Sequence, residues 1–452
     1  MKKTLFFASL LAMFALGAFA QEKEKPSFKF YGFVRNYACY DTRESLTSNS
    51  EQFYYMPKDI KRDETKENDL NAQDNIMLLS ITTRLGLNVN GLNFLGSKTS
   101  AKIEADFAGF GTSNTVLRIR QAYAKMDWKY SKLLVGQAWH PAMGDMMPDV
   151  FSLETGAPFT PFSRSPQVRY DYEVKNVKLT ATALYQFHYT SYGPEGASFN
   201  YARNAIVPEM YFQGIIKSGD FMMGVGVDLL TLKPRTQYNV TTKETVNPVV
   251  DKDGNQVYYD ESGIIAPEGT PLYVLSEKET TKTYKCNDEL MVSVTPTIFA
   301  QYKKDRWGVK GRVTYAQNAA HMSMISGYAV TEKLENGDWK YSSLNSIGGW
   351  VDATYKQPLK TGYLTFCCFA GYTKNLGCMN EIIGDIYMRG EKNMDYMWRV
   401  APSILYTHNA MQIGVEYNPT TVGYGKPDSK YNMSDIHAVT NHRICAMLKY
   451  NF

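Results

Sequence analysis

Charged side chains alternate with apolar ones along many segments of this chain. Arg118 and Arg120 alternate with leucine and isoleucine, and Glu104 and Asp106 alternate with isoleucine and alanine. Further charged residues in such segments are Arg84, Lys102, Arg169, Asp171, Lys310, Arg312 and Arg443. Arginine stays charged and binds carboxylate or phosphate through a planar fork, so a water-facing group of these residues could conduct anions. The alternative is that the arginines pair with Glu104, Asp106 and Asp171 and hold a protein wall together.

Alternation with a period of two predicts β-strands that have one apolar and one polar face. In Met77–Asn90, the clearest example, Leu79, Leu85 and Leu87 share one face and Arg84 lies on the other. About 16 segments follow this pattern along the chain, a number within the range of bacterial outer-membrane barrels. If their apolar faces contact lipid, the polar faces line a lumen, and a barrel of this size encloses an aqueous channel.

The last predicted strand, Ala438–Phe452, ends in two aromatic residues on its apolar face, Tyr450 and Phe452. Its length suits a tilted crossing of a bilayer better than a soluble strand, for which about 5–6 residues is usual. It resembles the closing strand of outer-membrane barrels, in which a terminal aromatic residue is part of the signal read by the barrel assembly machinery. The alternative is the edge strand of a soluble sandwich.

The first 20 residues have the features of a cleaved signal peptide. Lys2 and Lys3 precede an apolar stretch, and Ala18-Phe19-Ala20 fits a cleavage site. We therefore expect residues 1–20 to direct export, and residues 21–452 to form a single barrel domain in the outer membrane of a Gram-negative cell. The formal net charge of the chain is only +4, so there is no electrostatic footprint for nucleic acid.

The connections between the predicted strands alternate between short and long. Short ones include Lys175-Asn176 and His408-Asn409, and long ones include Asp41–Asn75 and Leu232–Asp288. A barrel inserted from the periplasm has short turns on that side and longer loops on the outside. We therefore predict an all-β fold, a transmembrane antiparallel up-and-down β-barrel with long extracellular loops and short periplasmic turns.

One long connection, Pro141–Pro166, is unusually rich in proline and phenylalanine for a solvated loop. Folding into the barrel as a constriction loop would bury Phe151 and bring Asp145, Asp149 and Glu154 toward the arginines. The alternatives are a lid on the outer rim, a contact between subunits, or a calcium site made by those carboxylates. Their spacing matches no known calcium loop.

The six cysteines show no metal-ligand spacing, and we predict neither a metal nor a cofactor. Adjacent Cys367 and Cys368 should face opposite sides of a strand. We interpret most of the cysteines as small apolar residues. One disulfide between the loop cysteines Cys286 and Cys378 is the alternative, because an exported protein meets an oxidising compartment.

Three motifs resemble those of a known family. They are YGFVRNYACYDTR at Tyr31–Arg43, TRLGLNV at Thr83–Val89, and the run IEADFAGFG…LRIRQAYAKMDW…LLVGQAWHP across Ile103–Pro141. They are similar to the DcaP-like trimeric porins. The resemblance implies a homotrimer in outer-membrane lipid that has no enzymatic activity and lets small anionic solutes, such as dicarboxylates, diffuse passively.

Other functions stay open at this point. Phosphate-selective and other solute-specific channels share the barrel and the arginines. A surface adhesin or receptor would use the long loops, above all Leu232–Asp288. A barrel phospholipase would need a histidine on its lipid face, where His442 falls, but no serine and asparagine are placed to complete a nucleophilic site.

Overall fold

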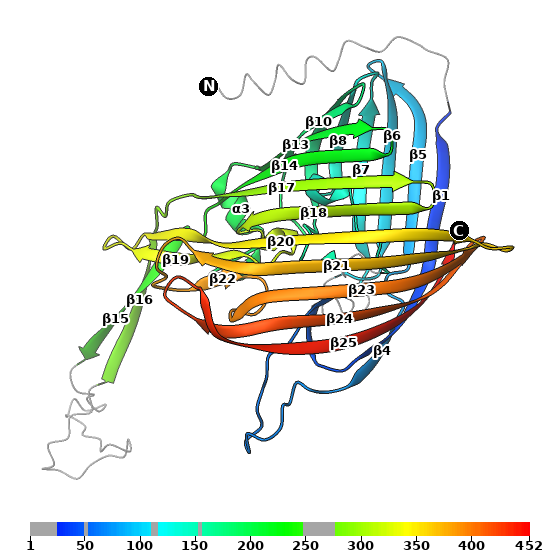
Figure 1. Ribbon diagram of the computed structural model, residues 1–452. Coiled ribbons are helices and arrows are strands. Elements are labelled where there is room, and N and C mark those ends of the chain that lie inside the picture. Colours follow the sequence, from blue (N-terminus) through cyan, green and yellow to red (C-terminus); the bar gives the residue numbers. More distant parts are fainter. Residues whose placement is uncertain (1–24, 49–52, 110–115, 152–155, 247–275) are drawn as a thin grey trace, which may run out of the picture.

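Sixteen antiparallel strands form one closed barrel in the part of the chain that the structure describes (Figure 1). The structure is a computed structural model and describes residues 25–48, 53–109, 116–151, 156–246 and 276–452. The barrel strands, in order around the wall, are β1 (Ser27–Asp41), β4 (Asn75–Leu79) continued by β5 (Arg84–Phe94), β6 (Ser97–Asp106), β7 (Arg118–Asp127), β8 (Ser131–Trp139), β9 (Arg164–Val174), β10 (Val177–Leu184), β13 (Glu209–Ser218), β14 (Phe221–Leu232), β17 (Met291–Lys304), β18 (Trp307–Gln317), β20 (Trp339–Pro358), β21 (Tyr363–Cys378), β23 (Met394–His408), β24 (Met411–Pro427) and β25 (Met433–Asn451). The predicted fold class and strand number are confirmed, whereas the predicted signal peptide lies outside the described residues.

The barrel closes where its first strand meets its last. β1 pairs with β4 and β5 along one edge and with β25 along the other. The backbone N–H of Gly32 donates to the carbonyl of Phe452 at 3.0 Å, and the N–H of Phe452 donates to the carbonyl of Gly32 at 3.1 Å. Closure leaves no strand edge without partners, which the interior of a bilayer requires because no water is present to satisfy one.

A disulfide joins the two strands of this seam. Cys39 and Cys445 are opposite each other in the register of β1 and β25, with their Cα atoms 4.2 Å apart. The interpretation of most cysteines as small apolar residues did not predict this bond. The alternative disulfide between Cys286 and Cys378 is wrong, since these two are buried free thiols. Cys367 is buried and Cys368 is exposed, as predicted for neighbours on one strand.

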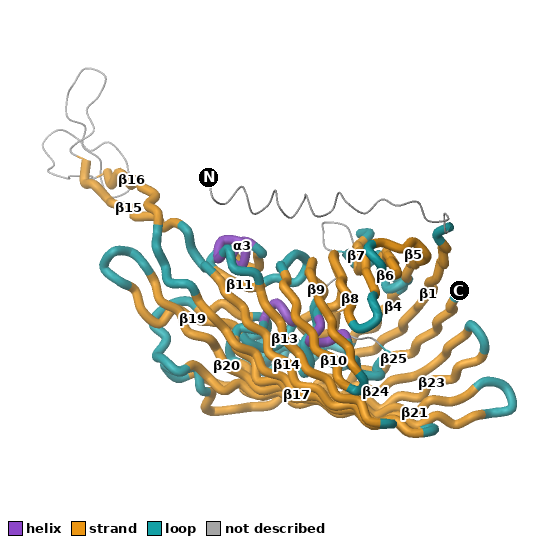
Figure 2. The backbone as a smooth tube through the Cα atoms, turned by 90° about the horizontal axis from the view of Figure 1, so that it is seen from above, coloured by secondary structure: helices purple, strands orange, loops and turns teal. Residues whose placement is uncertain are grey.

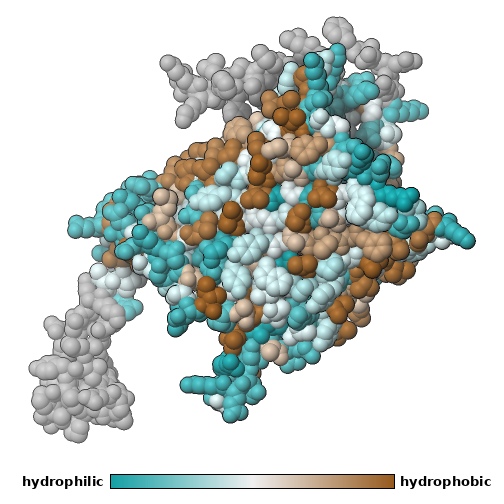
Figure 3. Space-filling view, viewed as in Figure 1, coloured by the Kyte–Doolittle hydropathy of each residue, from teal (hydrophilic) through white to brown (hydrophobic). Residues whose placement is uncertain are grey.

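The two faces of the strands are sorted as predicted. Ile103 and Ile119 point outward with 54% and 53% of their surface exposed, whereas Arg118 and Arg120 point inward and are 4% and 2% exposed. In Figure 3, apolar and pale residues spread over the strands, and hydrophilic residues gather at the loop end on the left of the view. No helix in the described residues has the length and apolar character needed to cross a membrane.

The segment predicted as one strand, Met77–Asn90, is interrupted. β4 ends at Leu79 and β5 begins at Arg84, because a turn in which the Thr83 N–H donates to the Ser80 carbonyl at 3.0 Å lies between them. This turn shifts the alternation, so Leu78 (81% exposed) faces outward in β4 while Leu85 (51% exposed) faces outward in β5. Leu79 instead packs against the buried cluster around Tyr37 and Phe151, which corrects its predicted place on the outer face.

One end of the barrel carries long connections and the other short turns (Figure 2). Tight turns are helped by Lys175 and Asn409, which adopt left-handed backbone angles with φ of 52° and 49°. The long connections contain the hairpin β2 (Ser45–Ser48) and β3 (Phe53–Pro57), strands β11 (Ser191–Gly193) and β12 (Gly196–Ser198), helix α3 (Asn200–Ala205), the projecting arm of β15 (Gln237–Val246) and β16 (Ser276–Lys285), the 3₁₀ turn η2 (Ala320–Met322), and strands β19 (Gly327–Lys333) and β22 (Ile386–Met388). The arm leaves the barrel at its long-loop end in both views.

Candidate pore constriction

The connection between β8 and β9 lies inside the barrel. It begins at His140, forms the short helix α2 (Pro141–Gly144) and returns to the wall at Arg164. Its backbone is hydrogen-bonded to side chains of several other strands: Asp149 N–H to Asp352 Oδ2 at 2.5 Å, Phe151 N–H to Glu416 Oε2 at 3.0 Å, Phe151 carbonyl to Tyr37 Oη at 2.8 Å, Ala157 carbonyl to Arg399 Nη1 at 2.9 Å, and the Ala142 carbonyl to Arg312 Nη1. We call the described residues of this connection, 140–151 and 156–163, the inward segment.

Apolar packing also holds the inward segment in place. Phe159 and Phe162 are at most 1% exposed and belong to a buried cluster with Phe53, Trp350 and Phe369 from other elements. The Phe159 and Phe369 rings have centroids 6.1 Å apart. Burying such side chains stabilises a structure by about 1.5–3 kcal/mol each, which explains why a segment this rich in phenylalanine leaves the solvent.

Arg118 and Arg120 lie in buried ion pairs on the wall. Arg118 donates two hydrogen bonds of 2.9 Å to Asp106, from Nε to Oδ1 and from Nη2 to Oδ2. Arg120 Nη1 lies 2.6 Å from Asp106 Oδ2, and its Nε lies 3.0 Å from Glu104 Oε1. The register of β6 with β7 sets Asp106 opposite Arg118. These contacts correspond to the alternative that the sequence left open, in which the arginines hold the wall together.

A second group of cations shares one aromatic ring on the neighbouring strands. Arg35, Arg84 and Lys449 each hold their charge 4.5–5.0 Å from the ring centre of Phe33. All three are partly exposed on strands β1, β5 and β25. The carboxylate that Arg84 reaches is Glu104, at 3.6 Å from Nη1, and Lys102 and Arg120 share it at 3.8 and 3.0 Å. Positive charge therefore exceeds negative charge along this side of the lumen.

Arg164 is a functional candidate that the sequence analysis missed. It starts β9, is 1% exposed, and lies with its guanidinium 4.6 Å from the Trp139 ring centre and 5.4 Å from that of Tyr189. Nη2 donates to Tyr189 Oη at 3.0 Å, while Nε and Nη1 have no hydrogen-bond partner among the described residues. Arg164 lies within the predicted loop Pro141–Pro166, but only the carboxylates of that loop are predicted as site residues.

Two carboxylates of the inward segment pair with lysines of the wall. Asp145 lies 3.0 Å from Lys178 Nζ, and Asp149 lies 2.8 Å from Lys310 Nζ. Burial alone would raise the pKa of Asp145, but Lys178 and Gln213 more than offset this, so its pKa lies below the usual value. Glu154 lies outside the described residues.

A cavity of about 330 Å³ lies against the inward segment, at Asp149, Val150 and Phe151. Among the residues that line it, the charged ones are Asp149, Lys303, Lys310, Asp352 and Lys356. Thr354, Thr365 and Ser403 also line it. Lysines therefore outnumber carboxylates in this cavity, beside apolar side chains such as Val150, Phe151 and Leu405.

Residues 20–202 match the sequence profile of the DcaP outer membrane protein family. The resemblance to DcaP is confirmed over these residues. The crystal structure of the outer membrane channel DcaP of Acinetobacter baumannii is similar at 17% identity and a TM-score of 0.60, covering 97% of this chain and 100% of that one. The anion-selective porin from Comamonas acidovorans is similar at 7% identity and a TM-score of 0.50, covering 95% and 100%. No curated protein sequence is significantly similar.

The remaining predicted residues of this DcaP-like barrel have clear places. Arg169 Nε lies 3.4 Å from Asp171 Oδ2, and Arg443 binds Asp41 through its Nε and Nη2, each 3.0 Å from one oxygen. Arg312 is 2% exposed and donates to carbonyls of the inward segment. Tyr450 and Phe452 are exposed on the outer face of the DcaP-like barrel, at 48% and 56%.

His442 is also exposed on the outer face. Its Nδ1 lies 2.8 Å from Tyr417 Oη, and the two rings are stacked with centroids 6.2 Å apart. An aromatic pair of this kind is common where an apolar body meets a polar edge. The contact accounts for this histidine without a catalytic role.

Proposed function

We propose that this chain is an outer-membrane porin through which small hydrophilic anions, of the size and charge of dicarboxylates, diffuse passively. The observation that carries the proposal is the positive side of the lumen, where Arg35, Arg84 and Lys449 surround Phe33 beside the inward segment. Fixed cations along a water-filled path lower the energy of a passing anion and raise that of a cation. Under this proposal the inward segment is the constriction.

The placement of Arg35 supports a contact between the basic residues and the constriction. Its Nη1 donates to the Phe151 carbonyl of the inward segment at 3.3 Å, and its Nε donates to Thr82 Oγ1 at 3.1 Å. Both acceptors are neutral, so the charge of Arg35 stays available to a solute. The DcaP structure is titled an outer membrane channel and the Comamonas structure an anion-selective porin, and both descriptions agree with the proposal.

The proposed cellular location follows from the proposal that the chain is an outer-membrane porin. Residues 1–20 would be removed on export, and Tyr450 and Phe452 would present the terminal signal to the barrel assembly machinery. The mature barrel would sit in the outer membrane of a Gram-negative cell as a homotrimer. A phosphate-selective channel would use the same cations, so solutes of both classes belong in the test.

Single-channel recording tests the proposal directly. Purified, folded protein in a planar bilayer is expected to give conductance steps. In a gradient of KCl, the reversal potential is expected to show preference for chloride. Dicarboxylate and phosphate added to one side should each reduce the chloride current if they enter the same path. Folded protein without conductance steps, or with a cation-selective reversal potential, would contradict the proposal.

Removing two of the less paired cations is expected to shift selectivity. A unit charge about 4 Å from an ion is worth about 1 kcal/mol in a water-like medium, so Arg35→Gln with Lys449→Gln should lower the chloride-to-potassium permeability ratio several-fold. The matched control is Lys426→Gln, a lysine with 79% side-chain exposure paired to Asp435 at the loop end. An unchanged reversal potential in the double variant would place Arg35 and Lys449 off the ion path.

A further inference from the structure

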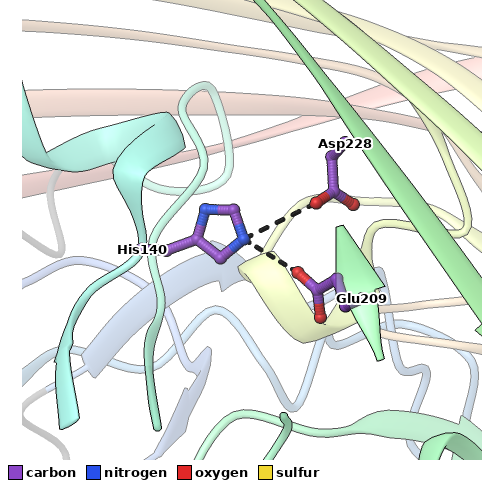
Figure 4. Close-up of side chains that lie close together, drawn as sticks. All are labelled: His140, Glu209 and Asp228. Atoms are coloured by element: carbon purple, nitrogen blue, oxygen red, sulfur yellow. Dashed lines mark hydrogen bonds and ion pairs between the residues drawn. The ribbon is translucent and has the colours of Figure 1, made fainter. Parts of the chain in front are cut away.

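Three side chains that could bind a metal meet where the inward segment begins, and His321 lies beside two of them. His140 starts that segment, Glu209 begins β13, Asp228 lies on β14 and His321 lies in η2. The four residues are between 0% and 2% exposed. Figure 4 shows the ring of His140 pointing between the carboxylates of Glu209 and Asp228. Residues far apart in the sequence therefore present nitrogen and oxygen atoms to one buried point.

The distances between these atoms are short. His140 Nε2 lies 2.8 Å from Glu209 Oε1 and 3.6 Å from Asp228 Oδ1. His321 Nε2 lies 3.1 Å from Glu209 Oε1 and 3.9 Å from Asp228 Oδ2. Ligand atoms of His140, Glu209 and Asp228 all lie within 4.8 Å of one another. Metal-binding nitrogen and oxygen atoms, each about 2 Å from one ion, are necessarily this close together.

Several polar atoms of the cluster have no hydrogen-bond partner in the part of the chain that the structure describes. They are Glu209 Oε2, Asp228 Oδ1 and His321 Nδ1, each buried. The neighbouring buried residues include Leu184, Met322 and Met324, which offer no donor side chains. A buried carboxylate oxygen without a partner is costly, so two in one cluster indicate that something else satisfies them.

Two carboxylates lie side by side in the cluster. Ala142 N–H donates to His140 Nδ1 at 3.1 Å, so Nε2 is the ring nitrogen that faces Glu209 and Asp228. Burying two carboxylates together is expensive unless positive charge compensates them.

We propose that His140, Glu209, Asp228 and His321 form a buried site for a divalent transition-metal ion of the zinc type. Neutral imidazoles with carboxylates suit this class of ion, whereas calcium and magnesium prefer oxygen ligands alone. A charge of +2 balances Glu209 and Asp228. The proton that His140 Nε2 donates to Glu209 moves to Nδ1 of the same ring, so that Nε2 can bind the ion, and His321 releases any second proton to solvent.

Occupation of the site is coupled to the inward segment. With its proton on Nδ1, His140 no longer accepts a hydrogen bond from the Ala142 N–H. The first turn of α2 therefore loses this bond when the ion binds. The ion also links the start of the inward segment and η2 to β13 and β14 by coordination bonds. A metal ion thereby fixes the position of the segment that we propose as the constriction, although the site itself does not depend on conduction.

A second group of potential ligands is less suitable. Cys286, Asp288 and Asp338 also approach one another among the described residues. The oxygens of Asp288 are already occupied by Arg235 at 2.7 and 2.9 Å, by Trp339 N–H at 2.9 Å and by Tyr341 Oη at 2.5 Å. This group therefore serves as a comparison for the test.

Metal content of the folded full chain tests the proposal. Protein without a histidine tag is treated with a chelator, incubated with Zn²⁺, freed of unbound ion by gel filtration and measured by elemental analysis. About one zinc per chain is expected. Co²⁺ in place of zinc should give visible absorption bands of cobalt held by nitrogen and oxygen ligands. Protein that retains no zinc and gives only the spectrum of aqueous cobalt would overturn the proposal without the need for a variant.

Variants assign the ion to this cluster. Glu209→Gln and His321→Gln should each weaken zinc binding at least about tenfold, since changes even to outer-shell partners cost about 10–100-fold. Asp338→Asn, in the comparison group, should bind as the wild type does. Only variants that migrate as folded barrels on unheated gels are compared. Undiminished binding in folded Glu209→Gln and His321→Gln would place the ion elsewhere and overturn the assignment, whatever the conductance of the protein.

Discussion

Replacing Cys39 with serine is expected to lower the free energy of unfolding by about 2–5 kcal/mol, the usual effect of losing a native disulfide. Cys39 and Cys445 are 406 residues apart in sequence and connect the first barrel strand to the last. The disulfide therefore closes almost the whole chain into one covalent ring. Without it, the seam between β1 and β25 relies on backbone hydrogen bonds and side-chain packing. Urea titration of folded protein in detergent, followed by tryptophan fluorescence, measures the change.

The chain offers matched controls for this prediction. Cys445→Ser should lose as much stability as Cys39→Ser, and the double variant should lose no more, because both remove the same bond. Cys368→Ser changes an exposed free cysteine on the outer face of β21 and should leave unfolding unchanged. A reducing agent should bring the wild type to the level of the variants. Equal midpoints for oxidised wild type and Cys39→Ser would show that the seam does not need the disulfide.

The fold could be predicted from the sequence because a barrel strand repeats a local signal. Apolar residues facing lipid and polar residues facing the lumen alternate along each strand, so each strand is visible without knowledge of its partners. The failure within Met77–Asn90 has a local cause. The residues of the turn at Ser80–Thr83 have the composition of a strand, but the turn reverses which side chains face outward after it. Counting alternate residues along the sequence does not reveal this reversal.

The disulfide and the proposed metal site depend on contacts that the sequence does not display. Cys39 meets Cys445 because of the register at which the barrel closes. His140 and His321 each contact Glu209 because two connections enter the lumen at one place. None of these residues has the short, regular spacing that marks a site in a linear motif. The inward segment was easier to recognise, since its phenylalanines had no place in water.

The arginines show how pairing decides function. The sequence placed Arg118 and Arg120 correctly on the polar face but left open whether they meet solutes or carboxylates. Their bonds to Asp106 and Glu104 make them part of the wall, whereas Arg35 and Lys449 have no carboxylate within ion-pair distance among the described residues. Selectivity is therefore expected to depend on the second pair and stability on the first.

Asp106→Asn is expected to lower the free energy of unfolding by about 3–5 kcal/mol, the cost of removing one partner from a buried ion pair. Asp106 is 0% exposed and accepts three bonds of 2.6–2.9 Å from Arg118 and Arg120. The amide keeps the shape of the carboxylate but offers one acceptor and no charge, so two buried guanidinium groups lose their main counter-ion. The same urea titration measures the loss.

Two further variants separate the ion pair from a general effect of substitution. Asp435→Asn removes an exposed carboxylate paired with Lys426 at 3.1 Å, and such surface pairs contribute about 0–1 kcal/mol. Asp106→Asn combined with Arg118→Gln should be less unstable than the two single changes added together, because the pair is removed as a unit. If Asp106→Asn unfolded at the same urea concentration as the wild type, water would have to reach Arg118 and Arg120 and replace the lost carboxylate. In that case these arginines would again be candidates for contact with the permeating solute.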